Sequence, residues 1–389
     1  MQILPVTDAA GNNEFIKVPL LIYKDDLNWI RPLDKDINEV FDEHKNKAFR
    51  FGKATRWILK DDEGRTVGRI AAFVNKKYKN KGDDMPVAGI GFFECINNQE
   101  AADLLFDNAK HWLIQQGMEA MDGPINFGER DRWWGLITAG YFEPLYCMNY
   151  NPPYYVNLFE NYGFKVFFNQ ICFGLDAQKK LAQKVIDRHK ILESNTDISF
   201  STIKKNNLEK YAVDFVEVYN KAWAGHGGLK QLTKDQVMIM FKKMKPVMDE
   251  DVLYFAYNKG IAISMFINLP DINQYFKHFN GKFGLIQKLE FLWRQRFRKS
   301  KKFVGMVFGT VPEWQGKGID SYIIGECAKI VQKPPYHYTE YEMQWIGDFN
   351  TKMINVAESL GETYRSRQLT TFRYIFDRTK EFKRHPMLA

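Results

Sequence analysis

The residues best suited to chemistry stand between 309 and 324, in the segment GTVPEWQGKGIDSYII. Within it, Gln315-Gly316-Lys317-Gly318 separates an apolar run that predicts a strand from a run with helical spacing. Glycines at such a junction let backbone N–H groups approach an anion, and the positive end of the following helix points at the same place. The segment therefore predicts a phosphate-binding loop, and a glycine-rich turn that binds nothing is the alternative.

The elements that must position this loop follow a regular order. Residues 301–311 predict a strand, and the spacing of Ile319, Ile323 and Cys327 predicts a helix that Pro334-Pro335 ends. A strand at 338–346, a helix from about 350 to 360 and a last strand at 370–377 complete the pattern. Upstream, helices at 207–228 and 233–248 precede a hairpin at 251–269.

The first half of the chain repeats this order. A hairpin at 55–75, a strand at 87–96, a helix at 99–116, a strand at 121–126, a helix at 154–164 and a strand at 165–176 are expected. Both halves thus look like one fold used twice. The first half lacks the phosphate loop, because no glycine stands between Glu94 and Ala101. Its tyrosines Tyr150, Tyr154 and Tyr155, beside two prolines, either pack a rigid turn or line an acceptor groove at the domain interface.

Length and composition fit two domains. The chain has 389 residues, 45% of them hydrophobic, which suffices for two cores. We predict an N-terminal domain at 1–176, a polar helical linker at 177–197, a C-terminal domain at 198–379 with a basic insert near 270–301, and a tail at 380–389. The four cysteines stand singly without metal-ligand spacing, so no metal site is predicted.

The net charge of +8 favours an anionic partner. Much of the charge lies in residues 285–302, where basic side chains alternate with Leu, Ile, Phe and Trp. Such a segment is either a solvated helix face or a basic amphipathic helix that contacts a membrane surface. A nucleic-acid partner is less favoured, because no recognition motif is present. Neither a signal peptide nor a transmembrane segment is evident, so a cytoplasmic location is expected, with peripheral contact at the inner membrane face as the variant.

The loop resembles the acyl-CoA loop of the GCN5-related N-acetyltransferase (GNAT) superfamily, whose pattern is Gln or Arg, two residues, Gly, one residue, then Gly or Ala. Gln315 and Gly318 fit, and Asp320 stands where the last small residue belongs. Nearly the whole chain resembles a two-domain bacterial GNAT subfamily, in which Asp at the position of Asp320 is usual. The segments that carry this resemblance are FGKATRWIL, VGRIAAFVN, GFFEC, GPINF, YNPPYY, YNKAWAGHGG, VPEWQGKGID and EMQWIGDFNTKMINVAESLG.

The resemblance implies an α/β fold (an α+β mixed sheet) of tandem GNAT domains, each a central mixed sheet flanked by helices. It implies an acyl-CoA-dependent N-acyltransferase that transfers an acetyl or longer acyl group to a small-molecule or lipid amine. Some relatives resemble enzymes that N-acylate sphingoid bases. A catalytically silent acyl-CoA-binding or regulatory protein is the alternative. The co-substrate, acetyl-CoA or a longer acyl-CoA, is expected to contact Val311, Gln315, Gly316, Lys317, Gly318, Ile319, Asp320 and Asn350.

Three residues are candidates for proton transfer. Glu342, on the strand beside the loop strand, is the first choice as a base, and a salt-bridged strand residue is its plain interpretation. His226 titrates in a useful range, and a capping or loop histidine is its alternative. Many GNAT enzymes protonate the departing thiolate with a tyrosine, but Ala357 stands at that position here. Tyr341 is a substitute acid candidate.

Overall fold

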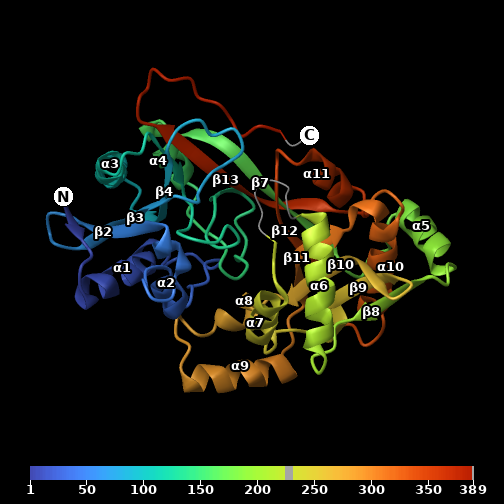
Figure 1. Cartoon of the computed structure of the whole chain (residues 1–389). Coiled ribbons are helices and arrows are strands. Elements are labelled where there is room, and N and C mark those ends of the chain that lie inside the picture. Colours follow the sequence, from blue (N-terminus) through green and yellow to red (C-terminus); the bar gives the residue numbers. More distant parts are fainter. Residues whose placement is uncertain (224–230, 388–389) are drawn as a thin grey trace.

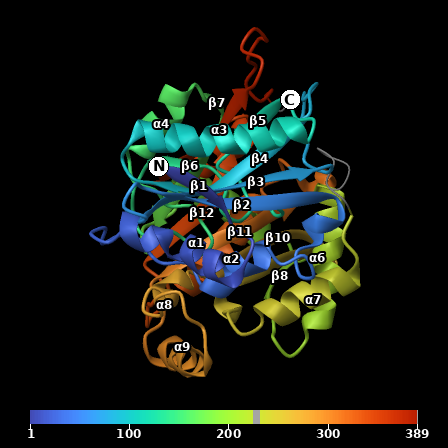
Figure 2. The ribbon, with the colours of Figure 1, turned by 90° about the vertical axis from the view of Figure 1, so that its left-hand side faces the viewer.

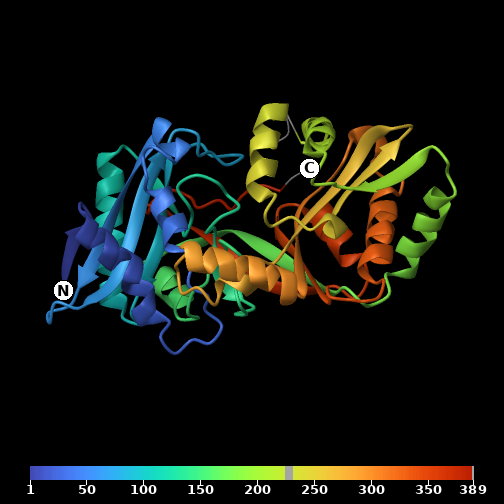
Figure 3. The same ribbon diagram turned by 90° about the horizontal axis from the view of Figure 1, so that it is seen from below.

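The computed structural model describes residues 1–223 and 231–387, arranged as two halves side by side (Figure 1 and Figure 3). The N-terminal half contains β1 (Gln2–Pro5), α1 (Ala9–Ile22), α2 (Asp34–Val40), the 3-10 turn η1 (Lys47–Arg50), β2 (Gly52–Lys60), β3 (Thr66–Asn75), β4 (Val87–Cys95), α3 (Gln99–Gln115), β5 (Ala120–Gly123), β6 (Leu136–Ala139), α4 (Tyr155–Tyr162) and β7 (Lys165–Asp176).

The C-terminal half begins with the linker helix. It contains α5 (Gln183–Glu193), β8 (Ile198–Thr202), α6 (Leu208–Ala222), α7 (Lys234–Met244), the 3-10 turn η2 (Glu250–Val252), β9 (Leu253–Asn258), β10 (Ile261–Pro270), α8 (Asn273–Phe276), α9 (Leu285–Phe297), β11 (Lys302–Thr310), the 3-10 turn η3 (Pro312–Trp314), α10 (Ile319–Val331), β12 (Glu340–Gly347), α11 (Thr351–Glu358) and β13 (Tyr364–Ile375). None of the described helices is long and apolar enough to cross a membrane.

One continuous mixed sheet of 13 strands runs through both halves. Its order is β1-β2-β3-β4-β5-β13-β7-β12-β11-β10-β9-β8, with β6 paired to β13 off this path. The closing strands are exchanged: β13, from the end of the chain, lies between β5 and β7, while β7 pairs with β12 of the C-terminal half. The linker at 177–197 therefore separates the two halves along the sequence, but the sheet continues from one half into the other.

Helices cover both faces of the sheet in each half. In the C-terminal half, Phe255 of β9 stacks on Tyr211 of α6, while the neighbouring Tyr254 faces Cys327 of α10. Successive strand residues point to opposite faces, so α6 and α10 lie on opposite sides. In the N-terminal half, α3 and α1 both contact β3 and stand on opposite sides of the sheet (Figure 2).

The exchanged strand β13 carries an arginine into each half. Arg367 makes a buried ion pair with Glu342 of β12 (Nε to Oε1, 2.7 Å), and Arg373 makes one with Asp122 of β5 (Nε to Oδ1, 2.6 Å). The side chains of all four residues are at most 5% exposed. Removing one partner of a buried ion pair is strongly destabilising, because the other charge is left buried without a partner. These two pairs therefore hold the exchanged strand in register with both halves.

The mixed α/β sheet and the repeated element order are confirmed. The structure adds elements that the sequence pattern did not predict, namely β1, α1 and α2 before residue 41, β6, and α8 in the insert. The insert packs against the N-terminal half: Asn273 donates to the carbonyl oxygen of Pro144 (2.6 Å), and Phe276 contacts Tyr146 edge-on. It therefore bridges the two halves rather than extending from one of them.

Candidate active site

The strand that leads to the glycine loop separates from its neighbour halfway along. The parallel ladder between β11 and β12 runs from Lys302–Glu340 to Gly305–Met343 and stops there, while β11 continues to Thr310. A bulge in the pairing with β10 falls at Met306, and β12 shifts register toward β7 after Met343. Bulges bend a strand away from its partner. Within the described residues, the main chain of residues 306–310 therefore has no strand partner on the β12 side.

The glycine loop lies at the end of this gap. Gly316 and Gly318 have left-handed backbones (φ 73° and 84°), which a side chain would strain. Gln315 donates its amide to the carbonyl oxygen of Thr310 (3.0 Å) and closes the turn, and Val311, 3% exposed, packs beneath it. Gly318 is the N-cap of α10 and provides no side-chain acceptor. The first N–H groups of α10, from buried Ile319 onward, are thus available to an anion.

The linker helix α5 supplies a cation beside the loop. The side chain that Gly318 lacks would stand 3.8 Å from Cβ of Arg188 and 3.5 Å from Leu192. Arg188 is exposed and has no ion pair or hydrogen bond within the described part of the chain. Lys317 lies over the ring of Trp314, 5.2 Å from its centre. Two cations thus flank the loop, and one carboxylate, Asp320, stands in the first turn of α10.

α5 is held firmly against α10. The ring of His189 stacks on Tyr322 and fills the space left by Gly325, and its Nε2 lies 2.8 Å from Glu326 Oε1. His189, Glu326 and Glu193 are close enough to suggest a metal site, but Lys329 already contacts both carboxylates. We read this cluster as the contact that fixes α5, and with it Arg188, at the loop.

The equivalent place in the N-terminal half is closed. The ladder between β4 and β5 also ends early, at Gly89–Asp122, but the chain returns to β4, where Ile125 donates its N–H to the carbonyl oxygen of Ile90 (2.7 Å). Asn98 caps α3 through a hydrogen bond from the N–H of Ala101 (2.9 Å). The hydroxyls of Tyr154 and Tyr155 bond to the main chain of Cys95. These contacts support the packing interpretation for Tyr154 and Tyr155, while Tyr150 and Tyr155 also line a pocket of the N-terminal half.

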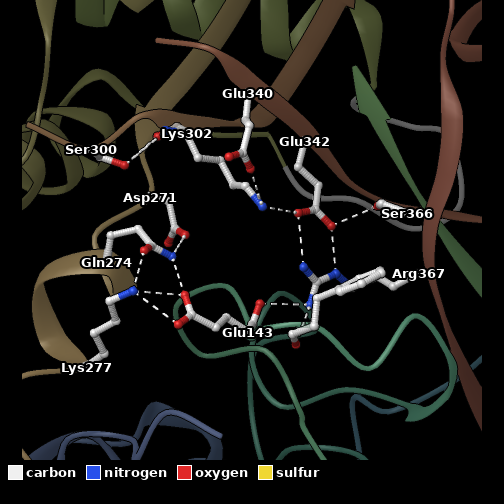
Figure 4. A network of polar contacts seen from close by, with 11 residues as sticks. Glu143, Asp271, Gln274, Lys277, Ser300, Lys302, Glu340, Glu342, Ser366 and Arg367 are labelled. Carbon is white, nitrogen blue, oxygen red and sulfur yellow. Dashed lines mark hydrogen bonds and ion pairs between the residues drawn. The ribbon is translucent and has the colours of Figure 1, made fainter. Parts of the chain in front are cut away.

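Glu342 lies in a buried polar network at the base of the gap (Figure 4). Its carboxylate accepts hydrogen bonds from Arg367 (2.7 and 3.1 Å), from the Ser366 hydroxyl (2.9 Å) and from Lys302 (3.3 Å). Burial by itself would raise the pKa of Glu342, but the charges of Arg367 and Lys302 outweigh it, and the pKa lies below its ordinary value. A carboxylate with every lone pair engaged is a poor proton acceptor. Its role as a base stays a prediction, and this geometry weighs against it.

Asp271 is a member of the network that the sequence did not single out. It directly follows β10, and Gln274 donates to it (3.1 Å) while also donating to Glu143 from the N-terminal half (3.0 Å). Burial raises the pKa of Asp271 to about 6 despite that hydrogen bond and the nearby charge of Lys302. A buried carboxyl group with a raised pKa beside a candidate site is a functional candidate. An Asp after a strand is so common that its sequence gave no such signal.

The remaining candidates lie in different places. Tyr341 is buried against Phe303 and Phe266, on the opposite face of β12 from Glu342, and burial raises its pKa well above the ordinary value. Asn350 caps α11 by accepting from the N–H of Met353 (3.2 Å), so its contact with a co-substrate stays a prediction. Ala357 is fully buried. His226 falls outside the described residues, shortly after Trp223, whose ring fills the space that the missing side chain of Gly309 leaves open.

Comparison with known proteins fits this geometry. No family model matches the chain. It is 22% identical over 372 residues to a protein named bacterial ceramide synthase from Caulobacter vibrioides, covering 94% of this chain and 95% of that one. It is 25% identical over 371 residues to Protein YghO of Escherichia coli K12, covering 91% of each.

Two solved structures match along nearly their whole length. A tandem GNAT protein from the clavulanic acid biosynthesis pathway aligns with a TM-score of 0.53 at 11% identity, covering 96% of this chain and 98% of that one. A GCN5-related N-acetyltransferase from Sphaerobacter thermophilus aligns with a TM-score of 0.52 at 9% identity, covering 96% of each. The split strands, the glycine loop and these full-length matches agree, and the chain has the tandem fold of the GCN5-related N-acetyltransferases.

Proposed function

We propose that this protein is an acyl-CoA-dependent N-acyltransferase whose C-terminal half binds the acyl-CoA. One observation carries the proposal: an open strand gap and an uncapped glycine loop meet at the end of β11, whereas the corresponding gap and helix end in the N-terminal half are both closed. The proposal includes acetyl-CoA and longer acyl-CoA, because nothing in the loop distinguishes chain lengths.

The residues around the loop suit a pyrophosphate and the arm attached to it. The first N–H groups of α10, from Ile319 onward, are available to the expected anion, and Arg188 and Lys317 add positive charge. On the side away from β10, the main chain of residues 306–310 has no strand partner within the described residues and offers donors and acceptors to the arm's amides. At the base of the gap, the side-chain oxygen of Asn268 is buried, has no donor within the described residues and lies beside Gly305, so it could accept from such an amide.

The reaction requires an amine nitrogen to attack the thioester carbonyl carbon. The new carbon–nitrogen bond replaces the carbon–sulfur bond, the amine loses a proton, and the thiolate gains one. Glu342 and Tyr341 remain the predicted proton carriers on β12, and Asp271 joins them because burial raises its pKa to about 6. Glu342, already saturated with donors, is better suited to positioning β12 than to accepting the proton.

A lipid amine of the sphingoid-base type is the acceptor class that we favour. Its support is the full-length similarity to a protein named bacterial ceramide synthase. The experiment is a thiol-release assay with acetyl-CoA or a long-chain acyl-CoA and, as acceptor, either a sphingoid base or a short water-soluble amine. We expect thiol release that depends on the sphingoid base. Release only with the short amine would retain the acyltransferase and reject the lipid acceptor, and no release with any pair would reject the enzyme.

A catalytically silent acyl-CoA-binding protein is the second candidate. Two observations favour it: Ala357 replaces the tyrosine that many GNAT enzymes use as an acid, and the Glu342 carboxylate is fully engaged. Binding of acyl-CoA in calorimetry, together with no thiol release from any acceptor, would select this candidate over the enzyme.

A further inference from the structure

Helix α9 packs against the protein through one buried residue and leaves its wide apolar face exposed. Phe291 is 5% exposed and belongs to a cluster with Leu33 and Tyr275. The other large apolar residues of the helix face outward, with exposures of 50 to 75%: Leu285, Ile286, Leu289, Leu292, Trp293 and Phe297. Figures 1 and 2 show α9 at the lower edge of the molecule, below α8.

The exposed side chains form one stripe. At about 100° per residue, the outward-facing residues fall within an arc of about 140°, and Phe291 lies on the opposite side of the helix. The stripe is thus not a fragment of the core that happens to be uncovered. A stable helix face of this width normally packs against something.

Cations without an ion pair accompany the stripe, on the helix and in the residues that follow it. Lys288, Arg296, Arg298, Lys299 and Lys301 are exposed, and none has an ion pair within the described residues. The acidic residue of the helix, Glu290, is already paired with Arg294 (2.8 Å). The surface therefore combines bulky apolar side chains, including a Trp, with uncompensated positive charge.

We propose that α9 is a lipid-binding face that holds the protein on an anionic membrane surface. The apolar stripe would enter the region between headgroups and acyl chains, and the cations would contact lipid phosphates. A second copy of this chain is a poorer occupant, because the same cations would face one another across a symmetric interface, and charged residues are depleted at interface centres. This inference stands independently of the proposed function.

The placement of α9 makes this contact relevant to both halves. The insert bridges them through the Asn273–Pro144 hydrogen bond and the ion pair between Lys277 and Glu143 (3.1 Å). α9 then ends a few residues before β11, the strand that leads to the glycine loop. A membrane bound along α9 would lie next to the junction of the two halves, where Figure 3 shows the helix crossing the middle of the molecule.

The test is cosedimentation of the whole chain, without acyl-CoA, with vesicles of equal parts phosphatidylcholine and phosphatidylglycerol. We expect binding that is absent with pure phosphatidylcholine and weakens as salt rises. A double variant, Leu289→Gln with Trp293→Gln, should lose about tenfold or more in partitioning, because both side chains leave water on binding. A charge variant, Lys288→Glu with Arg296→Glu, should also lose binding to the anionic vesicles.

The matched control is Ile114→Gln with Ile239→Gln, which removes exposed apolar side chains from α3 and α7. It should bind vesicles like the unmodified protein. Melting temperatures close to that of the unmodified protein establish that each variant is folded. Three outcomes would overturn the proposal: an unmodified protein that stays in solution, an apolar variant that binds unchanged, or a dimer in sedimentation equilibrium that the apolar variant dissociates. Because no acyl-CoA is present, failure here leaves the acyl-CoA site untested and intact.

Discussion

The gap between β4 and β5 and the gap between β11 and β12 start alike and end differently. In both, a short parallel ladder stops while one strand continues. After β5 the chain turns back, and Ile125 takes the place beside β4 at a point where Gly91 has no room for a side chain. After β12 no such segment returns to β11 within the described residues. Repetition of a fold therefore does not repeat its site, because a short following segment decides whether the gap stays open.

The helix ends show the same contrast. The N-terminus of α3 is satisfied by the Asn98 side chain, and that of α10 begins at a glycine that cannot cap it. A capped helix end has less to offer an anion, since one of its free N–H groups is already used. The comparison assigns acyl-CoA binding to one half only, and the following variants test it.

The largest effect is expected from breaking the buried ion pairs that β13 makes with each half. Arg367→Met should lower the free energy of unfolding by about 3–5 kcal/mol, because it leaves the Glu342 carboxylate buried without its main partner. Arg373→Met should lower the free energy of unfolding by a similar amount, because it leaves Asp122 buried without its ion-pair partner. Urea denaturation gives both values. A cost under about 1 kcal/mol for either variant would show that its pair does not hold the exchanged strand.

The second-largest effect is a pH dependence of stability, which we expect from the polar network below the open gap. The folded pKa of Asp271, about 6, is above its unfolded value, so the folded state binds the proton more tightly. Stability should fall as pH rises from about 4 to about 6, by an amount on the order of 3 kcal/mol from this group. Asp271→Asn should flatten the curve of unfolding free energy against pH in that window. An unchanged slope in the variant would mean that another group titrates there.

The sequence indicated the glycine loop more clearly than the strand exchange around it. Gln315, Gly316 and Gly318 form a local signal, because left-handed glycines before a helix have a recognisable pattern. The exchange of β7 and β13 depends on pairing between residues about two hundred positions apart, which no local periodicity encodes. The linker was predicted as a polar helix, and its docking through His189 on Gly325 was not, since a single buried face on a short helix is a weak signal.

Arg188 offers the next test, because α5 places this cation beside Gly318 of the open loop. Arg188→Ala should weaken acyl-CoA binding about tenfold or more, the loss expected for a charge-assisted contact with phosphate. Lys184→Ala, one turn earlier on the same exposed helix, is the matched control and should bind normally. Calorimetry measures both affinities, and equal losses in the two variants would indicate a general charge effect instead of a contact.

The smallest effect comes from uncapping the closed helix. Asn98→Ala should lower the free energy of unfolding by about 1 kcal/mol, because the N–H of Ala101 loses its acceptor. The number of acyl-CoA molecules bound per chain should not change, since Ile125 still fills the adjacent gap. A second binding event in calorimetry would show that capping alone closes the N-terminal half.

The most direct test of the single-site account is calorimetric titration with acetyl-CoA and a long-chain acyl-CoA of the unmodified protein, Gly318→Glu and Gly117→Glu. Both glycines have left-handed backbones with room for a side chain, so either change should cost about 1–2 kcal/mol of stability. Only Gly318→Glu places a carboxylate at the loop, and we expect it to lose about a hundredfold or more in affinity, since opposed like charges cost several kcal/mol. One acyl-CoA bound per chain, lost in Gly318→Glu and kept in Gly117→Glu, is the predicted result. Unchanged binding in Gly318→Glu, or none in the unmodified protein, would contradict the account.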